Sequence, residues 1–298
     1  MQFLTDPIAW WIDPFTQSAF MRNALWAALL TVATTSVVGT WVVLRGMTFL
    51  GDAFAHGVLP GIAAAYIVGF STTLGALAAA VAMAGGIYLI RNCSPLSEET
   101  SIGVLFVGFL ALAVVVMSSG AGAYSGDLTR FLFGSITGID NGDLRRQAVA
   151  AAISVVGIVV GHRAFFVMTF DETQARLAGM RPRLAHAALL TLLAISVVAS
   201  YETVGSLLVL AFLVAPAATA SLLVRRVPRI MVCAVGLGAI AAVIGLLVSY
   251  HHDTAAGATM ALATVVLLFF AMLLTNVLRA VRRPDREAAA AAEQHASA

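Results

Sequence analysis

Asp52 and His56 are the side chains in this sequence whose types and spacing most clearly suit chemistry. They stand in the run Gly51-Asp-Ala-Phe-Ala-His-Gly-Val-Leu-Pro-Gly61, within the otherwise apolar stretch Met47–Phe70. Residues four apart share one face of a helix, one turn from each other. An ionisable group at membrane depth costs at least about 2.5 kcal/mol, so such a pair marks a functional site by default.

A carboxylate oxygen and an imidazole nitrogen together suit Zn²⁺, Mn²⁺ or Fe²⁺. Two ligands do not complete a metal site, so further ligands must come from elsewhere. The alternative is an Asp52–His56 pair that is hydrogen-bonded inside a helix and binds no metal. Spacing alone leaves both interpretations open.

Other acids and histidines stand near predicted membrane boundaries. Glu202 lies between two apolar stretches, where it is either a further ligand facing a cavity or a helix-end residue. His251, His252 and Asp253 follow another stretch, where they either bind metal at an entrance or form an ordinary polar turn.

Composition identifies a polytopic membrane protein. The chain has 298 residues, of which 60% are hydrophobic and 11% charged, and soluble domains of this length are far more polar. No lysine occurs among the seventeen basic residues, so the Walker A lysine of a P-loop is missing and this chain cannot hydrolyse ATP by that route. The two cysteines are far apart and do not have the spacing of a metal site.

Nine apolar stretches are long enough, or nearly so, to cross a bilayer, which takes about 20 helical residues. They are Ala24–Leu44, Met47–Phe70, Thr73–Ile90, Ser101–Met117, Gln147–Gly161, Leu184–Ser200, Thr203–Val224, Ile230–Tyr250 and Thr254–Leu278. The second and seventh contain Gly and Pro, which membrane helices tolerate where neighbours or a cavity satisfy the backbone. These two are therefore the expected pathway helices.

Three regions are expected along the chain. Residues 1–21 are expected to form an amino-terminal segment that lies at the membrane interface, and residues 22–280 the transmembrane domain. Residues 281–298 are expected to form a cytoplasmic tail that is disordered or a frayed helix. Arginine positions predict the orientation, because thirteen of the seventeen fall on one side of the membrane. The positive-inside rule makes that side cytoplasmic, together with the carboxyl terminus. Residues 118–143 and 251–253 then face outside.

A polar run between two spans on the cytoplasmic side predicts a short helix that an external motor can contact. It extends from Asp171 to Arg183 within a loop at 170–184. Acids precede the helical part and glycine follows it. The expected contact residues are Asp171, Glu172, Ala175, Leu177 and Gly179. A solvated turn is the alternative.

Three blocks of the sequence resemble the membrane permeases of the bacterial zinc, manganese and iron ABC importers. They are residues 43–61 (VLRGMTFLGDAFAHGVLPG), 127–134 (DLTRFLFG) and 204–220 (VGSLLVLAFLVAPAATA). With residues 97–103 and 249–257, the match covers nearly the whole chain in the expected order.

This resemblance implies an all-α fold of the type II ABC importer kind, with about eight to nine transmembrane helices, in a homodimer in the bacterial cell membrane. It also implies a separate ATPase subunit, an extracytoplasmic metal-binding receptor and a transported divalent metal, with no permanently bound cofactor and no nucleic acid. Asp52 and His56 match the acid and histidine of the family's metal pathway, and Asp171–Arg183 matches its coupling helix. The amino-acid sequence of the first block is more similar to zinc-associated members of the family than to manganese-associated ones. Zinc is therefore expected first, then manganese and iron.

Two rival classes of protein remain as alternatives. A gradient-driven secondary transporter would carry protonatable residues at the midplane and repeated halves, and no clear repeat is seen. An intramembrane metalloenzyme would need a motif such as His-Glu-x-x-His, which the sequence lacks.

Overall fold

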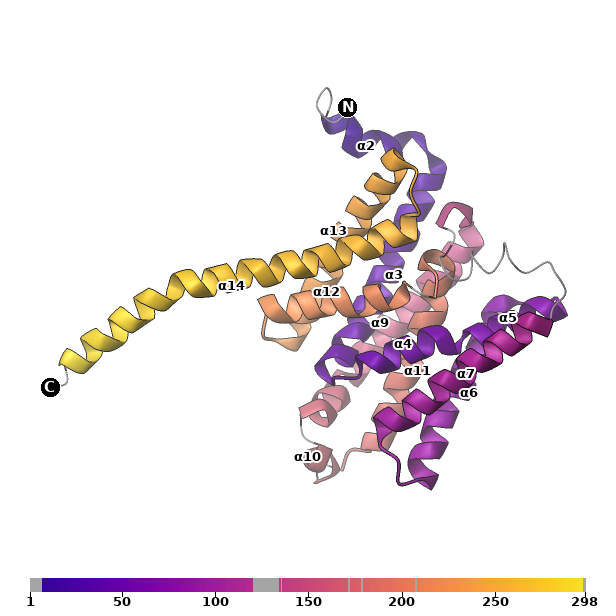
Figure 1. The fold of residues 1–298 in the computed structure, drawn as a ribbon, viewed down its shortest axis with the longest axis horizontal. Helices are drawn as coiled ribbons and strands as arrows, with labels where there is room; N and C mark the ends of the chain where they lie inside the picture. Colours follow the sequence, from indigo (N-terminus) through magenta and orange to yellow (C-terminus); the bar gives the residue numbers. More distant parts are fainter. Residues whose placement is uncertain are drawn as a thin grey trace.

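The computed structural model describes residues 7–119, 134, 136–170, 172–177, 179–206 and 208–296, and every regular element in this part of the chain is helical. The elements are α2 (Pro7–Gln17), α3 (Ala19–Leu44), α4 (Thr48–Gly57), α5 (Leu59–Val68), α6 (Thr72–Cys93), α7 (Glu98–Ser119), η1 (Ile136–Gly138), α9 (Asn141–Phe170), α10 (Glu172–Leu177), α11 (Pro182–Val204), α12 (Val209–Leu223), α13 (Val227–His252) and α14 (Ala256–Ala296). Figure 1 shows a helical bundle with α2 at one end and α10 at the other, from which the carboxyl-terminal part of α14 extends.

Eight of the described helical segments are long and apolar enough to cross a membrane, which confirms the all-α, polytopic fold. The stretch Met47–Phe70 crosses as two helices, α4 and α5, joined at Val58. The stretch Thr203–Val224 begins with the last two residues of α11 and continues as the 15-residue helix α12. Gly205, with a φ of 86°, breaks the chain between them.

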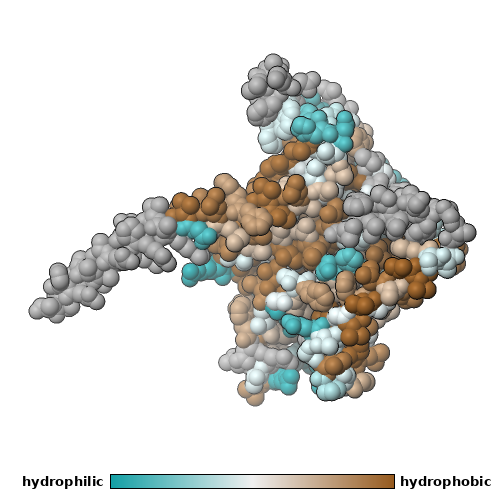
Figure 2. All heavy atoms as spheres, viewed as in Figure 1, coloured by the Kyte–Doolittle hydropathy of each residue, from teal (hydrophilic) through white to brown (hydrophobic). Residues whose placement is uncertain are grey.

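Helix α3 is the centre of the bundle and packs against α9, α11, α12 and α13. Its buried face is rich in hydroxyl groups, because Thr34, Thr35 and Thr40 each donate to the carbonyl four residues earlier and so need no other partner. The outer helices have the opposite character. Exposed Val, Leu and Phe side chains on α7 and α14 give the broad apolar surfaces expected where lipid replaces water (Figure 2).

Glycines allow the helices to approach closely. A Cβ on Gly61 of α5 would lie 2.1 Å from the backbone oxygen of Gly75 on α6, and a Cβ on Gly75 would lie 2.3 Å from the oxygen of Gly61. Without hydrophobic driving force in lipid, such small-residue contacts are a main source of helix association. The lack of a side chain at Gly39 likewise lets α3 lie directly against the backbone of Leu213 on α12.

Reciprocal hydrogen bonds cap the amino-terminal end of α9. The N–H of Asp143 donates to Oδ1 of Asp140 at 2.7 Å, and the N–H of Asp140 donates to Oδ2 of Asp143 at 3.1 Å. This arrangement satisfies amides that have no partner within the helix. The bond from the Asp143 amide lowers the pKa of the Asp140 carboxyl below its ordinary value.

The described residues are helical near both ends of the chain. Helix α2 occupies most of the segment 1–21 and packs on α3 and α13. Helix α14 continues to Ala296, well past the apolar stretch that ends at Leu278, where a disordered tail or a frayed helix was expected from residue 281. The three regional boundaries themselves stay predictions.

Candidate functional site

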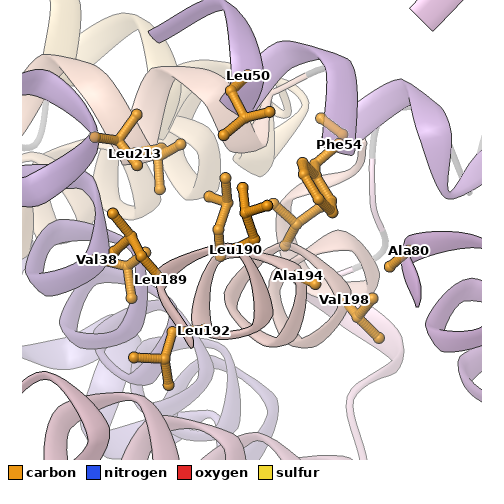
Figure 3. Packing of buried hydrophobic residues seen from close by; sticks show 14 of the residues in the cluster. Val38, Leu50, Phe54, Ala80, Leu189, Leu190, Leu192, Ala194, Val198 and Leu213 are labelled. Carbon is orange, nitrogen blue, oxygen red and sulfur yellow. The ribbon is translucent and has the colours of Figure 1, made fainter. Parts of the chain in front are cut away.

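Helix α4 positions Asp52 and His56 by burying the face opposite to them. Leu50 and Phe54 on that face are fully buried, and Figure 3 shows them close to Leu190 and Ala194 of α11. Gly51 adds to this contact, since a Cβ there would lie 2.5 Å from a side-chain carbon of Leu213. The rotation of α4 is therefore fixed by packing, and Asp52 and His56 are held on its other face.

Asp52 and His56 form a pair within one helical turn. Nδ1 of His56 lies 3.4 Å from Oδ1 of Asp52 and 3.0 Å from the backbone oxygen of Asp52. The side chains are 16% exposed for His56 and 28% for Asp52, so the pair opens onto the surface of the chain. Since Nδ1 is engaged, Nε2 of His56 is the ring nitrogen that remains for a ligand.

An aromatic group from another helix borders the pair. The ring of Phe106 on α7 meets the His56 ring edge-on, with 5.5 Å between centroids and 83° between planes. Phe49 of α4 makes a similar edge contact with Phe106 at 5.7 Å. These rings shield one side of His56 and fix its orientation. The sequence did not indicate Phe106, because an apolar residue in an apolar span gives no signal of its own.

Pro60 explains why the helix breaks just past the pair. Proline has no N–H, so it cannot donate to the carbonyl four residues earlier, which is that of His56. Gly57 follows His56 and packs against Met83, whose sulfur would lie 2.1 Å from a Cβ at this position. A short α4 joined to α5 is therefore dictated by local sequence and by close packing together.

Glu202 lies near the end of α11 and is held by hydroxyl groups. Its Oε1 accepts hydrogen bonds from Oγ1 of Thr73 at 2.8 Å and from the hydroxyl of Tyr201 at 3.1 Å. Nearby, Nε2 of Gln147 donates to Oγ1 of Thr203 at 3.0 Å and also bonds Thr31. These contacts tie α3, α6, α9 and α11 together, and sequence analysis did not find them because the partners are distant in the chain.

His251 takes part in a contact between α2 and α13. Its ring stacks on that of Trp10 of α2, with centroids 4.5 Å apart and planes inclined by 10°. His252 and Asp253 are exposed, and Asp253 ends α13 with a φ of 52°. This contact gives His251 a structural role at the α2 end of the bundle.

The structure does not gather these residues into one metal site. Within the part of the chain that it describes, no group of three or more His, Cys, Asp or Glu residues is placed to hold an ion. Asp52 and His56 stand together, whereas Glu202 and the residues of segment 251–253 have other neighbours. Their roles as ligands stay predictions.

Helix α10 is a short helix at the place where the polar run predicted one. Ala175 is buried, whereas the apolar side chain of Leu177 is 83% exposed. Gly179 ends the helix with a φ of 72°, and the amides of Gly179 and Met180 bond the carbonyls of Arg176 and Ala175. Asp171 and the side chain of Glu172, both expected in this element, lie outside what the structure describes. Helix α10 packs on the end of α9 and the start of α11.

Comparisons with known proteins agree with this architecture. A family model described as the ABC 3 transport family matches residues 17–275. The "Manganese transport system membrane protein MntC" of Listeria monocytogenes is 34% identical over 262 residues, which cover 88% of this chain and 93% of that protein. The "Probable iron transport system membrane protein" of Haemophilus influenzae is 32% identical over 268 residues, covering 90% and 98%. A solved structure, "PsaBC from Streptococcus pneumoniae in complex with Fab", superposes with a TM-score of 0.80 at 31% identity, covering 89% of this chain and 95% of that one.

Proposed function

We propose that this chain, which belongs to the ABC 3 transport family, forms the membrane path of an ATP-driven importer for a divalent transition-metal ion. The chain is a membrane permease and not an enzyme. The observation that carries the proposal is the Asp52–His56 pair, an oriented carboxylate and imidazole within a membrane span. A hydrated ion that enters such a span loses water, and these two groups replace part of that lost coordination.

Several metals suit a carboxylate and an imidazole, so the proposed substrate is a class of ions. The sequence favoured zinc, whereas the relatives are named for transport of manganese and iron. We therefore propose Mn²⁺ or Fe²⁺ ahead of Zn²⁺. The lack of a third nearby ligand within the described residues fits a site that must release its ion after binding it.

We propose that a second copy of the chain completes the metal site at Asp52 and His56. Asp52 and His56 are partly exposed at the surface of one chain, so two copies that face each other across this surface would supply two carboxylates and two imidazoles. Closed two-fold dimers are also the commonest arrangement among soluble homo-oligomers. The proposed importer is thus built on a homodimer in the cell membrane.

We propose that a separate ATPase subunit contacts α10 and supplies the energy for transport. The chain has no lysine for a Walker site. The exposed Leu177 presents an apolar side chain at the tip of the bundle, and Gly179 sets the turn that follows it. The α10 end is then cytoplasmic, as the arginines indicate, together with the carboxyl terminus. A metal-binding receptor delivers the ion at the α2 end.

Reconstitution into proteoliposomes tests this function. The chain is expected to take up radioactive Mn²⁺ or Fe²⁺ only when its ATPase subunit, its receptor and ATP are all present. Uptake by the chain alone, driven by an imposed proton or sodium gradient, would instead identify a secondary transporter. A parallel series with Zn²⁺ ranks the substrates under identical conditions.

A further inference from the structure

Glu202 and Gln147 line one end of a large groove along α11, the end that lies away from α10. The volume of the groove is 810 Å³, and α6 and α9, which both pack on α11, form its walls. No residue of α4 is among the described residues that line it, so the groove is separate from the Asp52–His56 pair.

The carboxylate of Glu202 has one oxygen engaged and one that the described chain leaves free. Oε1 accepts the hydrogen bonds from Thr73 and Tyr201. Among the described residues, none donates to Oε2 and no cationic group lies within ion-pair distance of it. A half-buried carboxylate at the end of a membrane helix is costly without donors, so Oε2 is available to a ligand from outside the chain.

Gln147 brings a second unused acceptor to the same end of the groove. The residue is only 5% exposed, and its Nε2 donates to Thr31 and Thr203. No donor reaches its amide oxygen within the part of the chain that the structure describes. Because the two hydroxyl groups hold the amide in place, its oxygen is a fixed acceptor beside the groove.

The charges that line this end are complementary to a cation. Asp143 and Arg146 of α9 pair with each other, which leaves the charge of Glu202 uncompensated among the described lining residues. A metal ion would need more ligands, and no group of three His, Cys, Asp or Glu residues is placed to hold one in the described chain. A primary ammonium group carries three N–H donors and no acceptor, which matches a carboxylate oxygen and an amide oxygen together.

The rest of the groove is apolar and open to its surroundings. Leu190, Ala194 and Val198 of α11 form a buried floor, whereas Val81 and Ile153 on the walls are exposed. Leu190 precedes Glu202 by twelve residues, which is about 18 Å along a helix. Half of the hydrocarbon core of a bilayer is about 15 Å thick. The floor therefore has the length of one acyl chain that starts at the level of Glu202.

We propose that this groove binds phosphatidylethanolamine, with its ammonium group held by Glu202 and Gln147 and one acyl chain lying along α11. Phosphatidylcholine fits the apolar part equally, but its quaternary ammonium has no N–H to donate to these oxygens. The proposal goes beyond metal transport and does not depend on it. Metal uptake does not require the lipid, because the groove and the Asp52–His56 pair are separate.

Native mass spectrometry of the purified full-length chain tests the headgroup site without metal or ATPase. The probes are palmitoyl-oleoyl phosphatidylethanolamine and the phosphatidylcholine with the same acyl chains. We expect the chain to retain phosphatidylethanolamine about tenfold more strongly, which corresponds to one charge-assisted hydrogen bond. Equal retention of the two lipids would overturn the proposal.

Glu202→Gln should abolish this preference and leave retention of phosphatidylcholine unchanged. The new amide oxygen can still accept from Thr73 and Tyr201, so the variant loses the charge and keeps the contacts between helices. The matched control is Asp253→Asn, which removes an exposed carboxylate outside the groove at a φ of 52° that asparagine tolerates. The control should keep the preference. A preference that survives in Glu202→Gln, or is lost equally in both variants, would contradict the proposed site.

A second pair of variants tests the acyl-chain part of the groove. Gly85 of α6 lines the groove, and a Cβ there would meet no atom within 4 Å, so Gly85→Leu should fill the groove and lower retention of both lipids several-fold. Gly108→Leu on α7, where a Cβ likewise meets no atom, lies outside the groove and should have no effect. Unchanged retention in Gly85→Leu would exclude the groove as the place of the acyl chain.

Two further outcomes would also overturn the proposal. Complete competition by millimolar ethanolamine would identify a site for a free amine. Disulfide formation between copies that carry cysteines at Val81 and Val149, in membranes and on a background without Cys93 and Cys233, would place a second copy in the groove. Retained lipid and no such cross-link are the expected results.

Discussion

Nδ1 of His56 faces both the carboxylate and the backbone oxygen of Asp52, at 3.4 Å and 3.0 Å, so one residue orients the ring of the other. The imidazole can rotate little without losing these contacts and its edge contact with Phe106. Asp52 thus has two tasks in the proposed site: it supplies negative charge and it fixes the direction of the second ligand.

Asp52→Asn should reduce metal uptake on the order of 100-fold, because the variant keeps the shape but loses the charge that compensates the cation. His56→Ala should be at least as damaging. Uptake into proteoliposomes that contain the whole importer is the measurement, and co-purification of the ATPase shows that each variant is folded. Glu202→Gln is the control, since Glu202 is held by Thr73 and Tyr201. Loss of uptake in Glu202→Gln together with normal uptake in Asp52→Asn would show that the ion path runs past Glu202 and not past Asp52.

Gly179→Ala should weaken coupling between ATP hydrolysis and transport. A side chain at a φ of 72° costs about 1–2 kcal/mol, so α10 should leave its observed position. Gly179→Pro should be more severe, because proline requires a negative φ and removes the amide that bonds Arg176. Charge reversal at Glu172 should uncouple as well. Uptake per ATP hydrolysed is the measurement.

Gly69→Ala is the matched control for that experiment. Gly69 has a φ of 75°, and its amide donates to the carbonyl three residues earlier, as that of Gly179 does. It lies at the end of α5 and not in α10. If both variants lowered coupling equally, general strain and not docking at α10 would be responsible.

Gly75→Ala should destabilise the bundle by about 1–3 kcal/mol, because the new Cβ would lie 2.3 Å from the backbone oxygen of Gly61 and would force α5 and α6 apart. The melting temperature of the purified chain, followed by the fraction that stays monodisperse on heating, should fall by several degrees. Gly85→Ala on the same helix meets open space and should leave it unchanged or raise it slightly. Equal melting temperatures for Gly75→Ala and the wild type would contradict the close α5–α6 contact.

Cysteine labelling tests the orientation of the bundle. On a background without Cys93 and Cys233, a cysteine at His252 should react with an impermeant thiol reagent applied to intact cells. A cysteine at Leu177, which is strongly exposed at the opposite end, should react only after the membrane is opened. The reverse pattern would show that the arginine count assigns the wrong side.

Much of the architecture could be predicted because the membrane imposes it residue by residue. Apolar length alone indicated α3, α6, α7, α9, α11, α13 and α14. The stretch Thr203–Val224 differs from the bounds of α12 for a local reason, since hydropathy does not register a backbone break at Gly205 between two apolar helices. The sequence left a disordered tail and a frayed helix both open after Arg286, because alanine-rich sequence is compatible with a helix whether or not it packs on a core, and α14 extends to Ala296.

The sequence by itself determined the class of protein, the Asp52–His56 pair and the short helix α10, because each depends on composition or on spacing within one helix. Only the tertiary structure decided what surrounds them. It brought Phe106 to His56, Thr73 to Glu202 and Trp10 to His251, and it separated Glu202 and His251 from the pair. Contacts between helices depend on how each helix is rotated about its axis. That rotation is set by which small residues, such as Gly61 and Gly75, allow two backbones to meet.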